Sequence, residues 1–397
     1  MDVTILPCKL QGEIAVIPSK SQAHRMLICA AFADAPTSLI CPETSRDMDA
    51  TADCLRALGA QILHSDSGYY VIPVQKIPER AVLPCKDSGS TLRFMLPVVG
   101  ALGVDATFLP EGRLAQRPLS PLWEEMERMG CQLSRPTENT IRCTGKLTPG
   151  TYYIDGGISS QFITGLLLAL PMLKVESRIC ITGKLESKPY VDMTCQAMKC
   201  FGVTSDNYTV SGAGYRSEGV YCIEGDWSNG AFFLAANALG SDIHVTNLSD
   251  DSAQGDKASR SLLEQLSESV TISAADILDL VPVLSVVAAH NHGAVFTDIR
   301  RLRLKESDRV ATVIAMIQAL GGSAEATEDT LTIHGTGLSG GTVDAYNDHR
   351  IAMSAAIAST ACRQKVTVLG GECVHKSYPR FWDEFQRLGG KYEQHLR

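Results

Sequence analysis

Apolar positions in this chain form a helix-to-strand pattern that recurs along its length. In each copy a helical pattern ends in a hydrophobic residue and a glycine, and a strand-like run follows. These glycines are Gly59, Gly130, Gly202, Gly321 and Gly389. Glycine just past a helix is a common stop signal because it adopts a left-handed backbone without strain. Each copy therefore predicts a helix followed by a strand.

The spacing of these copies predicts a protein built by internal repetition. Consecutive copies lie about 70 residues apart. The wider gap between Gly202 and Gly321 leaves room for a shorter copy, whose helix near residues 261–266 lacks the glycine. Strand-like runs alternate with the helices near residues 40, 69–72, 106–109, 152–154, 179–181, 243–245 and 366–369. We therefore expect an α/β or α+β protein of six units, arranged as two three-unit domains.

Domain crossings are predicted at two places where turn residues interrupt the pattern. One lies before Pro18-Ser19-Lys20 and the other lies near Glu224-Gly225-Asp226. No low-complexity linker marks either place.

The bulk composition excludes several classes of protein. The chain has 397 residues, of which 45% are hydrophobic and 20% charged, as is typical of a globular protein. Its formal net charge of -8 argues against general attraction to nucleic acid or anionic lipid. Two apolar runs, 162–173 and 278–289, contain proline and fall short of the ~18 residues that cross a bilayer. With no signal-like N-terminus, we expect a cytoplasmic protein without nucleic-acid or membrane partners.

Cysteines are scattered singly through apolar contexts. There are 13, and none forms a Cys-x-x-Cys pair. Free cysteines behave as small buried hydrophobes in a reducing compartment, so we expect neither a disulfide framework nor a zinc site.

Cations gather where helices begin. Lys305-Glu306-Ser307-Asp308-Arg309 directly precedes the helical pattern of residues 310–320. Cations at a helix start oppose the helix dipole, so this arrangement suits an anionic ligand. A solvated helix face with paired charges would use the same residue types.

Repetition favours the anion-site interpretation. Lys20, Ser21 and Arg25 open one helical pattern, and three further helix starts combine small hydroxyl residues, Gly, Asn or Asp with arginine or glutamine. These are Ser88-Gly89-Ser90-Thr91 with Arg93, Ser159-Ser160-Gln161, and Asn347-Asp348-His349-Arg350. Hydroxyl side chains cap helices, and glycine lets the backbone approach a ligand. In an acidic chain these cations must act locally.

Eight short segments of this kind are spread over most of the chain: Ser19-Lys20-Ser21 with Arg25, Asp87-Ser88-Gly89-Ser90-Thr91-Leu92-Arg93, Arg117-Pro118, Ser159-Ser160-Gln161-Phe162, Ser187-Lys188-Pro189-Tyr190, Lys305-Glu306-Ser307-Asp308-Arg309, Asp348-His349-Arg350 and Lys376-Ser377-Tyr378-Pro379. Together, and in this order, they resemble the EPSP synthase family of enolpyruvyl transferases. Any one motif is weak, whereas eight in sequence are specific.

The resemblance implies a two-domain fold in which each domain has three βαββαβ-type units in an inside-out, barrel-like arrangement. The N-terminal domain would span residues 18–223. The first strand would join the other domain, which would then comprise residues 1–17 plus 224–397. The active site would lie in the interdomain cleft.

The resemblance also implies 3-phosphoshikimate 1-carboxyvinyltransferase activity, a step of the shikimate pathway of aromatic amino acid biosynthesis. The enolpyruvyl group of phosphoenolpyruvate would pass to the 5-hydroxyl of shikimate 3-phosphate, with release of phosphate. No metal or organic cofactor is implied, and we expect a monomer.

Site residues follow by resemblance, position by position. Shikimate 3-phosphate would contact Lys20, Ser21, Arg25, Ser159, Ser160, Gln161, Ser187, Asp279 and Lys305, with Tyr190 and Arg301 as further candidates. Phosphoenolpyruvate would contact Lys20, Gly89, Arg117, Gln161, Arg309, Arg350 and Lys376. Arginine forks pair with carboxylate and phosphate, and a Cβ at residue 89 would project toward the small substrate.

The chemistry needs one proton delivered to the methylene carbon and another removed from the attacking hydroxyl. Lys20, Asp279 and Glu306 are the candidates for these tasks, because carboxylates beside lysines can have pKa values pushed apart. Asp279 could instead cap the following helix. Arg93 could be structural, and Lys188, Asp192 and His349 could be surface or supporting groups. His24 and His375 are disfavoured as bases.

Two rival functions stay open at this point. The sister enzyme that transfers enolpyruvate to UDP-N-acetylglucosamine normally has a reactive cysteine ahead of the Arg-Pro pair, and residues 111–116 contain none. A non-catalytic anion-binding relative would not need two carboxylates among the cations. The chain departs from the family pattern at two places, since Arg300-Arg301 and Asp87 stand where other residue types are usual.

Overall fold

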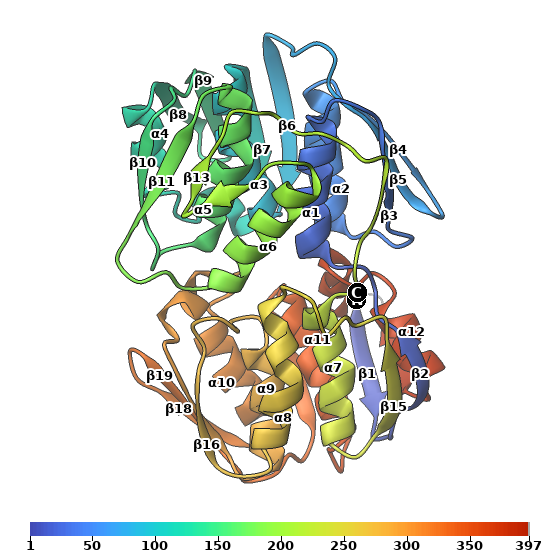
Figure 1. Ribbon diagram of the computed structural model, residues 1–397. Coiled ribbons are helices and arrows are strands. Elements are labelled where there is room, and N and C mark those ends of the chain that lie inside the picture. Colours follow the sequence, from blue (N-terminus) through green and yellow to red (C-terminus); the bar gives the residue numbers. More distant parts are fainter. Residues whose placement is uncertain (396–397) are drawn as a thin grey trace. The chain divides into compact units, whose positions relative to one another are not determined.

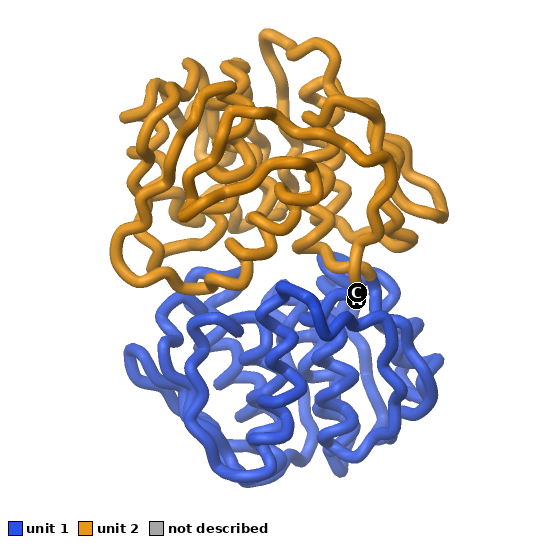
Figure 2. The backbone as a smooth tube through the Cα atoms, viewed as in Figure 1, with its two compact units in different colours: residues 1–17, 225–397 blue, residues 18–224 orange. Residues whose placement is uncertain are grey.

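The computed structural model describes residues 1–395. The chain divides into two compact units, one of Met1–Ile17 with Gly225–Arg397 and the other of Pro18–Glu224 (Figure 2). Glu224 falls in the Pro18–Glu224 unit, one residue beyond the expected boundary, because its carbonyl accepts a hydrogen bond from the Ser19 N–H at 2.7 Å.

Three four-stranded sheets form the Pro18–Glu224 unit, and all three share one pairing scheme. In each, a parallel pair is extended by two antiparallel neighbours. Their strand orders are β14 (Val220–Cys222)-β3 (Thr37–Ile40)-β5 (Gly68–Ile72)-β4 (Gln61–Ser65), β6 (Arg80–Lys86)-β7 (Asp105–Pro110)-β9 (Thr140–Gly145)-β8 (Cys131–Thr137), and β10 (Thr151–Asp155)-β11 (Ser177–Thr182)-β13 (Thr209–Val210)-β12 (Ser205–Asp206).

Helices connect these strands and pack beside the sheets (Figure 1). They are α1 (Lys20–Ala31), α2 (Arg46–Ala57), α3 (Gly89–Leu102), α4 (Leu122–Arg128), α5 (Ser160–Ala169) and α6 (Lys188–Cys200).

The order of elements within a repeat differs from the predicted βαββαβ order. One complete repeat reads β6-α3-β7-α4-β8-β9, which is β-α-β-α-β-β. The parallel strands β6 and β7 need a helical crossover, whereas β8 and β9 are antiparallel neighbours joined by a turn. Both helices therefore precede the hairpin. The mixed α/β class built by repetition is confirmed.

Within residues 1–17 and 225–395, the other unit contains two sheets of the same scheme and one two-stranded sheet. Strand β1 pairs with β21 and β22, which brings the start of the chain into this unit. The sheets are β20 (Gly341–Asp344)-β21 (Val366–Leu369)-β1 (Asp2–Leu6)-β22 (Lys391–His395), β16 (Val270–Ser273)-β17 (Ala294–Thr297)-β19 (Thr330–His334)-β18 (Ser323–Ala326), and β15 (Asp242–Thr246)-β2 (Gln11–Ala15).

The expected short copy corresponds to this two-stranded sheet. Strands β2 and β15 are parallel, and the helix expected near residues 261–266 is α8 (Ser259–Gln265). The unit's other helices are α7 (Trp227–Ala238), α9 (Val281–His290), α10 (Arg309–Ala319), α11 (His349–Ala358) and α12 (Phe381–Arg387).

Local sequence explains where these elements begin and end. In α10, Asp308 caps the first turn by accepting from the Val310 and Ala311 N–H groups, and Gly321 follows the helix with φ +83°. The helix buries Val313 and Ile317 on one face. All five predicted stop glycines have positive φ, so their helix-ending role is confirmed.

Each unit buries its own hydrophobic core. Phe94, Phe108 and Phe162 are among the largest buried side chains of Pro18–Glu224, and Phe232, Phe296 and Phe381 are their counterparts in the other unit. Separate cores are what independent domains require. Within residues 1–395, every helix is too short or too polar to span a membrane.

Candidate functional site

Polar contacts join the first turns of the helices in Pro18–Glu224. Ser19, Ser88 and Ser159 cap α1, α3 and α5 by accepting backbone N–H bonds, and each capped turn carries candidate residues. This unit therefore has several helix starts that favour anions.

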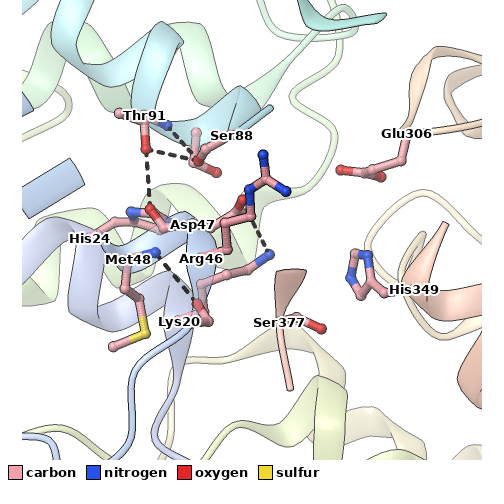
Figure 3. Close-up of polar contacts among 12 residues, drawn as sticks. Lys20, His24, Arg46, Asp47, Met48, Ser88, Thr91, Glu306, His349 and Ser377 are labelled. Carbon is pink, nitrogen blue, oxygen red and sulfur yellow. Dashed lines mark hydrogen bonds and ion pairs between the residues drawn. The ribbon is translucent and has the colours of Figure 1, made fainter. Parts of the chain in front are cut away.

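Lys20, the first residue of α1, pairs with Asp47 in the first turn of α2. Figure 3 shows the two side chains. Lys20 Nζ lies 3.0 Å from Asp47 Oδ2, and the exposed fractions of the side chains are 15% and 5%. In addition, hydrogen bonds between side-chain hydroxyl groups join Thr51 to Thr91 and Thr91 to Ser88. Sequence reasoning missed Asp47 because an acidic residue in a first helical turn is ordinary helix chemistry.

Arg25 ties three helices together. Its guanidinium donates to Thr194 Oγ1 at 2.8 Å, Tyr190 O at 3.0 Å and Ser21 O at 2.6 Å, and it stands 5.0 Å above the Phe94 ring. Burial lowers the pKa of Arg25 to about 10, so it stays a cation at neutral pH. Most of its donors are directed at protein acceptors.

Gly89 permits close packing of Arg117 against the start of α3. A Cβ built at residue 89 would lie 2.7 Å from Arg117 Nη1 and 3.1 Å from Arg93 Nη1. The resemblance implies that a Cβ at residue 89 would project toward the small substrate, and in the structure the group nearest to that Cβ is the guanidinium of Arg117, itself a phosphoenolpyruvate candidate. Arg93 in turn donates to Gln161 Oε1 at 2.8 Å, which fixes Gln161 of α5.

The remaining candidates of this unit differ in exposure. Ser160 and Ser187 are buried at the starts of α5 and α6, whereas Ser21 and Tyr190 are half-buried. Lys188 and Asp192 form an exposed i,i+4 ion pair at 2.6 Å, which fits a surface role.

His24 is wholly buried and is not suited to be a base. Its Nδ1 lies 2.6 Å from Thr51 Oγ1. Burial lowers the pKa of His24 to about 3, so the ring is neutral near pH 7. His375, the second disfavoured base, is exposed.

Arg309 organises the corresponding cluster in the other unit. It is 1% exposed and bonds three carboxylates, at 2.6 Å to Asp279 Oδ1, 2.8 Å to Glu306 Oε2 and 2.8 Å to Asp348 Oδ2. Asp348 also caps α11 by accepting from the Arg350 N–H. The sequence marked Asp348 as part of a motif but did not identify its role as the partner of Arg309.

Asp279 is surrounded by cations and does not cap α9, whose N-cap is Leu280. Its carboxylate lies 3.2 Å from Lys305 Nζ and 3.8 Å from Arg350 Nη2, in addition to Arg309. Burial raises the pKa of Asp279, but these three cations outweigh it and hold the pKa well below the usual range. Burial also lowers the pKa of Lys305, against the opposing charge of Asp279.

Arg350 and Lys376 are buried near the start of α7. Arg350 Nη1 donates to the Ser228 carbonyl at 3.0 Å. Lys376 ends the turn η5 (Gly371–Lys376), and the carbonyl of the adjacent Ser377 accepts from Asn229 Nδ2 at 3.5 Å. Arg301, in the turn η4 (Arg300–Leu304), is near enough to Lys305 to lower its pKa.

The structure thus gathers the candidates into one cluster per unit. Lys20, Arg25, Arg117 and Gln161 belong to the first, and Asp279, Lys305, Glu306, Arg309 and Arg350 to the second. Within residues 1–395, no group of His, Cys, Asp and Glu side chains is arranged to hold a metal ion.

Repeated four-stranded sheets and cation-rich helix starts define a class of two-unit α/β protein suited to small polyanions. A family model described as EPSP synthase (3-phosphoshikimate 1-carboxyvinyltransferase) matches residues 6–279 and 268–385. The chain belongs to the EPSP synthase family.

Curated relatives and solved structures agree with this assignment. The 3-phosphoshikimate 1-carboxyvinyltransferase of Clostridium novyi is 36% identical over 425 residues, with 98% of each chain covered. The protein of the same name from Clostridium perfringens is 38% identical over 417 residues, with 98% of each covered. The structure of an EPSP synthase from Acinetobacter baumannii has a TM-score of 0.81 at 23% identity, covering 99% of this chain and 100% of that one, which supports the fold.

Proposed function

We propose that this protein transfers the enolpyruvyl group of phosphoenolpyruvate to the 5-hydroxyl of shikimate 3-phosphate, releasing phosphate. The observation that carries the proposal is the second cluster, in which Asp279 and Glu306 stand among Lys305, Arg309 and Arg350. Cations alone would suffice to bind polyanions, whereas two carboxylates placed among them can also handle protons.

We further propose that both clusters act on the same pair of substrates. Lys20, Ser21, Arg25, Ser159, Ser160, Gln161, Ser187, Asp279 and Lys305 would serve shikimate 3-phosphate. Lys20, Gly89, Arg117, Gln161, Arg309, Arg350 and Lys376 would serve phosphoenolpyruvate. Arg25 and Arg309 are bonded mainly to protein groups, so their contribution would be charge and positioning of neighbours.

The carboxylates divide the proton transfers according to their surroundings. Asp279 is held ionised by three cations, so it would accept the hydroxyl proton or stabilise positive charge at the central carbon rather than donate. Glu306 accepts a hydrogen bond from Arg309 Nη2 at 2.8 Å and would be the proton donor to the methylene carbon, with Lys20 as the third proton-handling group.

We also propose a cytoplasmic monomer. Its cysteines are free in residues 1–395, which fits a reducing compartment. Gel filtration with light scattering would test the monomer.

Phosphate release tests the function directly. The purified chain would be incubated with phosphoenolpyruvate and either shikimate 3-phosphate or UDP-N-acetylglucosamine. We expect phosphate release with shikimate 3-phosphate as the acceptor and none with UDP-N-acetylglucosamine. Release only with the sugar nucleotide would favour the sister activity, and none with either acceptor would favour a non-catalytic relative. Glu306→Gln should lower kcat by about 10²- to 10⁴-fold, and Glu393→Gln, on the exposed strand β22, serves as its matched control.

A further inference from the structure

Asp256 is a buried carboxyl outside the proposed substrate contacts. It lies in the turn η3 (Gly255–Ala258) and is 3% exposed. Its Oδ2 accepts a hydrogen bond from the Ser228 hydroxyl, and its Oδ1 has no hydrogen-bond partner among residues 1–395. Burying a carboxyl with an unbonded oxygen costs free energy, so the position calls for a functional reason.

Ser228 links Asp256 to Arg350. Ser228 lies in the first turn of α7, and its carbonyl accepts from Arg350 Nη1 at 3.0 Å while its hydroxyl bonds Asp256. The other terminal nitrogen of Arg350 lies 3.8 Å from Asp279 Oδ2. Two carboxyl groups therefore act on one guanidinium, Asp279 directly and Asp256 through Ser228.

We propose that Asp256 is a positioning residue that holds Arg350 through Ser228 and makes phosphoenolpyruvate binding depend on pH. This inference rests on the proposed function, in which Arg350 contacts phosphoenolpyruvate.

The charged groups around Asp256 set its titration. Asp279, Arg350 and Asp226, the N-cap of α7, act on it electrostatically. Charges on the neighbouring α8, Arg260 and Glu264, are exposed. Lys257 of the same turn donates to the Asp250 carbonyl at 2.7 Å.

Burial, followed by the charge of Asp279, raises the pKa of Asp256 to about 7, against the opposing effects of the Ser228 bond and Arg350. Below this pH the carboxyl is neutral and Arg350 faces one carboxylate. Above it, a second negative charge is present and opposes a bound anion. By linkage, a bound anion favours protonated Asp256, so affinity falls as pH rises.

Measuring kcat/KM for phosphoenolpyruvate between pH 6 and 9 would test the proposal. The four proteins to compare are wild type, Asp256→Asn, Ser228→Ala and the exposed control Asp251→Asn. Asparagine keeps an acceptor for Ser228 but cannot ionise. In wild type and Asp251→Asn we expect kcat/KM to fall about tenfold as pH rises, which corresponds to one pKa unit of coupling. Asp256→Asn should lack this decrease. Ser228→Ala should move the decrease to higher pH. The Ser228 hydrogen bond favours the ionised carboxylate, so its loss raises the pKa of Asp256.

Thermal midpoints without substrates report on the same titration independently of activity. A carboxyl with a raised folded-state pKa binds more protons than in the unfolded chain, so wild type should lose stability relative to Asp256→Asn as pH rises from 5 to 8. An active wild type whose alkaline decrease persists unchanged in Asp256→Asn would overturn this inference alone. A wild type that releases no phosphate at any pH would overturn the proposed function and the inference with it, even if the midpoints follow the expected trend.

Discussion

Arg309 Nε lies 2.8 Å from Asp348 Oδ2, and the two side chains are 1% and 0% exposed. A buried charge pair of this kind stabilises a fold only while both partners are present, because either one alone leaves an uncompensated charge out of water. Asp348 also accepts from Ser307 Oγ at 2.9 Å and caps α11, so it fixes the loop ahead of α10 and the start of α11 together. The geometry of the second cluster depends on this pair.

Asp348→Ala should destabilise the protein by about 3–5 kcal/mol, since it leaves Arg309 buried without one partner and removes a helix cap. Urea unfolding followed by circular dichroism measures this. Arg303→Gln breaks the partly exposed 3.4 Å pair with Asp308 and should cost about 1 kcal/mol or less. Equal losses in the two variants would show that burial does not control the strength of the Arg309–Asp348 pair.

Gly89→Ala should alter substrate use more than folding. The added Cβ would meet the Arg117 guanidinium, which ends a flexible side chain and can move, so the fold should persist. Displacing Arg117 should raise KM for phosphoenolpyruvate by about 10- to 100-fold, as expected for a binding group shifted by about 1 Å. Steady-state kinetics with each substrate varied measures this effect.

The double variant Gly89→Ala with Arg117→Ala provides the control. If the effect of Gly89→Ala acts through Arg117, the double variant should be no worse than Arg117→Ala alone. Full additivity would mean that the methyl group acts on the substrate directly.

Much of the fold was predictable because it is encoded locally. Helix periodicity, serine and aspartate caps, and stop glycines such as Gly321 act within a few residues of each other. The order of helices and strands within a repeat was predicted wrongly because it depends on pairing between strands such as β6 and β7, with α3 between them. The local pattern of apolar residues in a strand does not indicate whether a helix or the second strand of a hairpin follows it.

The candidate site was predictable only in part, for a similar reason. Cations were identifiable because lysine and arginine are unusual at helix starts. Two of the carboxylates that hold them were not identified as their partners, because Asp348 lies 39 residues from Arg309 and Asp47 lies 27 residues from Lys20. Asp256 carried no signal, since an isolated aspartate beside glycine is typical of a surface turn.

Asp279→Asn should lower kcat by about 10²- to 10⁴-fold across pH 5–9. Its plot of kcat against pH should keep any decrease at acidic pH that wild type shows. Its folded-state pKa is depressed, so the carboxylate is ionised throughout that range, and the stability it contributes is lost only as pH falls below about 4. Because Asp279 raises the pKa of Asp256, the alkaline decrease should also move to lower pH. The control is Asp276→Asn at an exposed neighbouring position. An acidic limb present in wild type and absent from Asp279→Asn would show that this carboxyl titrates within the range.

His24 should make the protein sensitive to mild acid. Its folded-state pKa of about 3 lies below the ordinary value of 6.5, because burial disfavours the charged ring. The unfolded chain therefore binds the extra proton, and stability falls as pH drops from about 6.5 toward 3, by up to about 1.4 kcal/mol per pH unit. His24→Asn keeps an amide to bond Thr51 and removes the titration, so urea unfolding at pH 6.5, 5.5 and 4.5 should show a shallower loss than wild type. His244→Asn, which alters a 74% exposed histidine, should follow wild type. Parallel losses in wild type and His24→Asn would mean that the ring is protonated in the folded protein, contrary to its burial against Phe94 and Thr51.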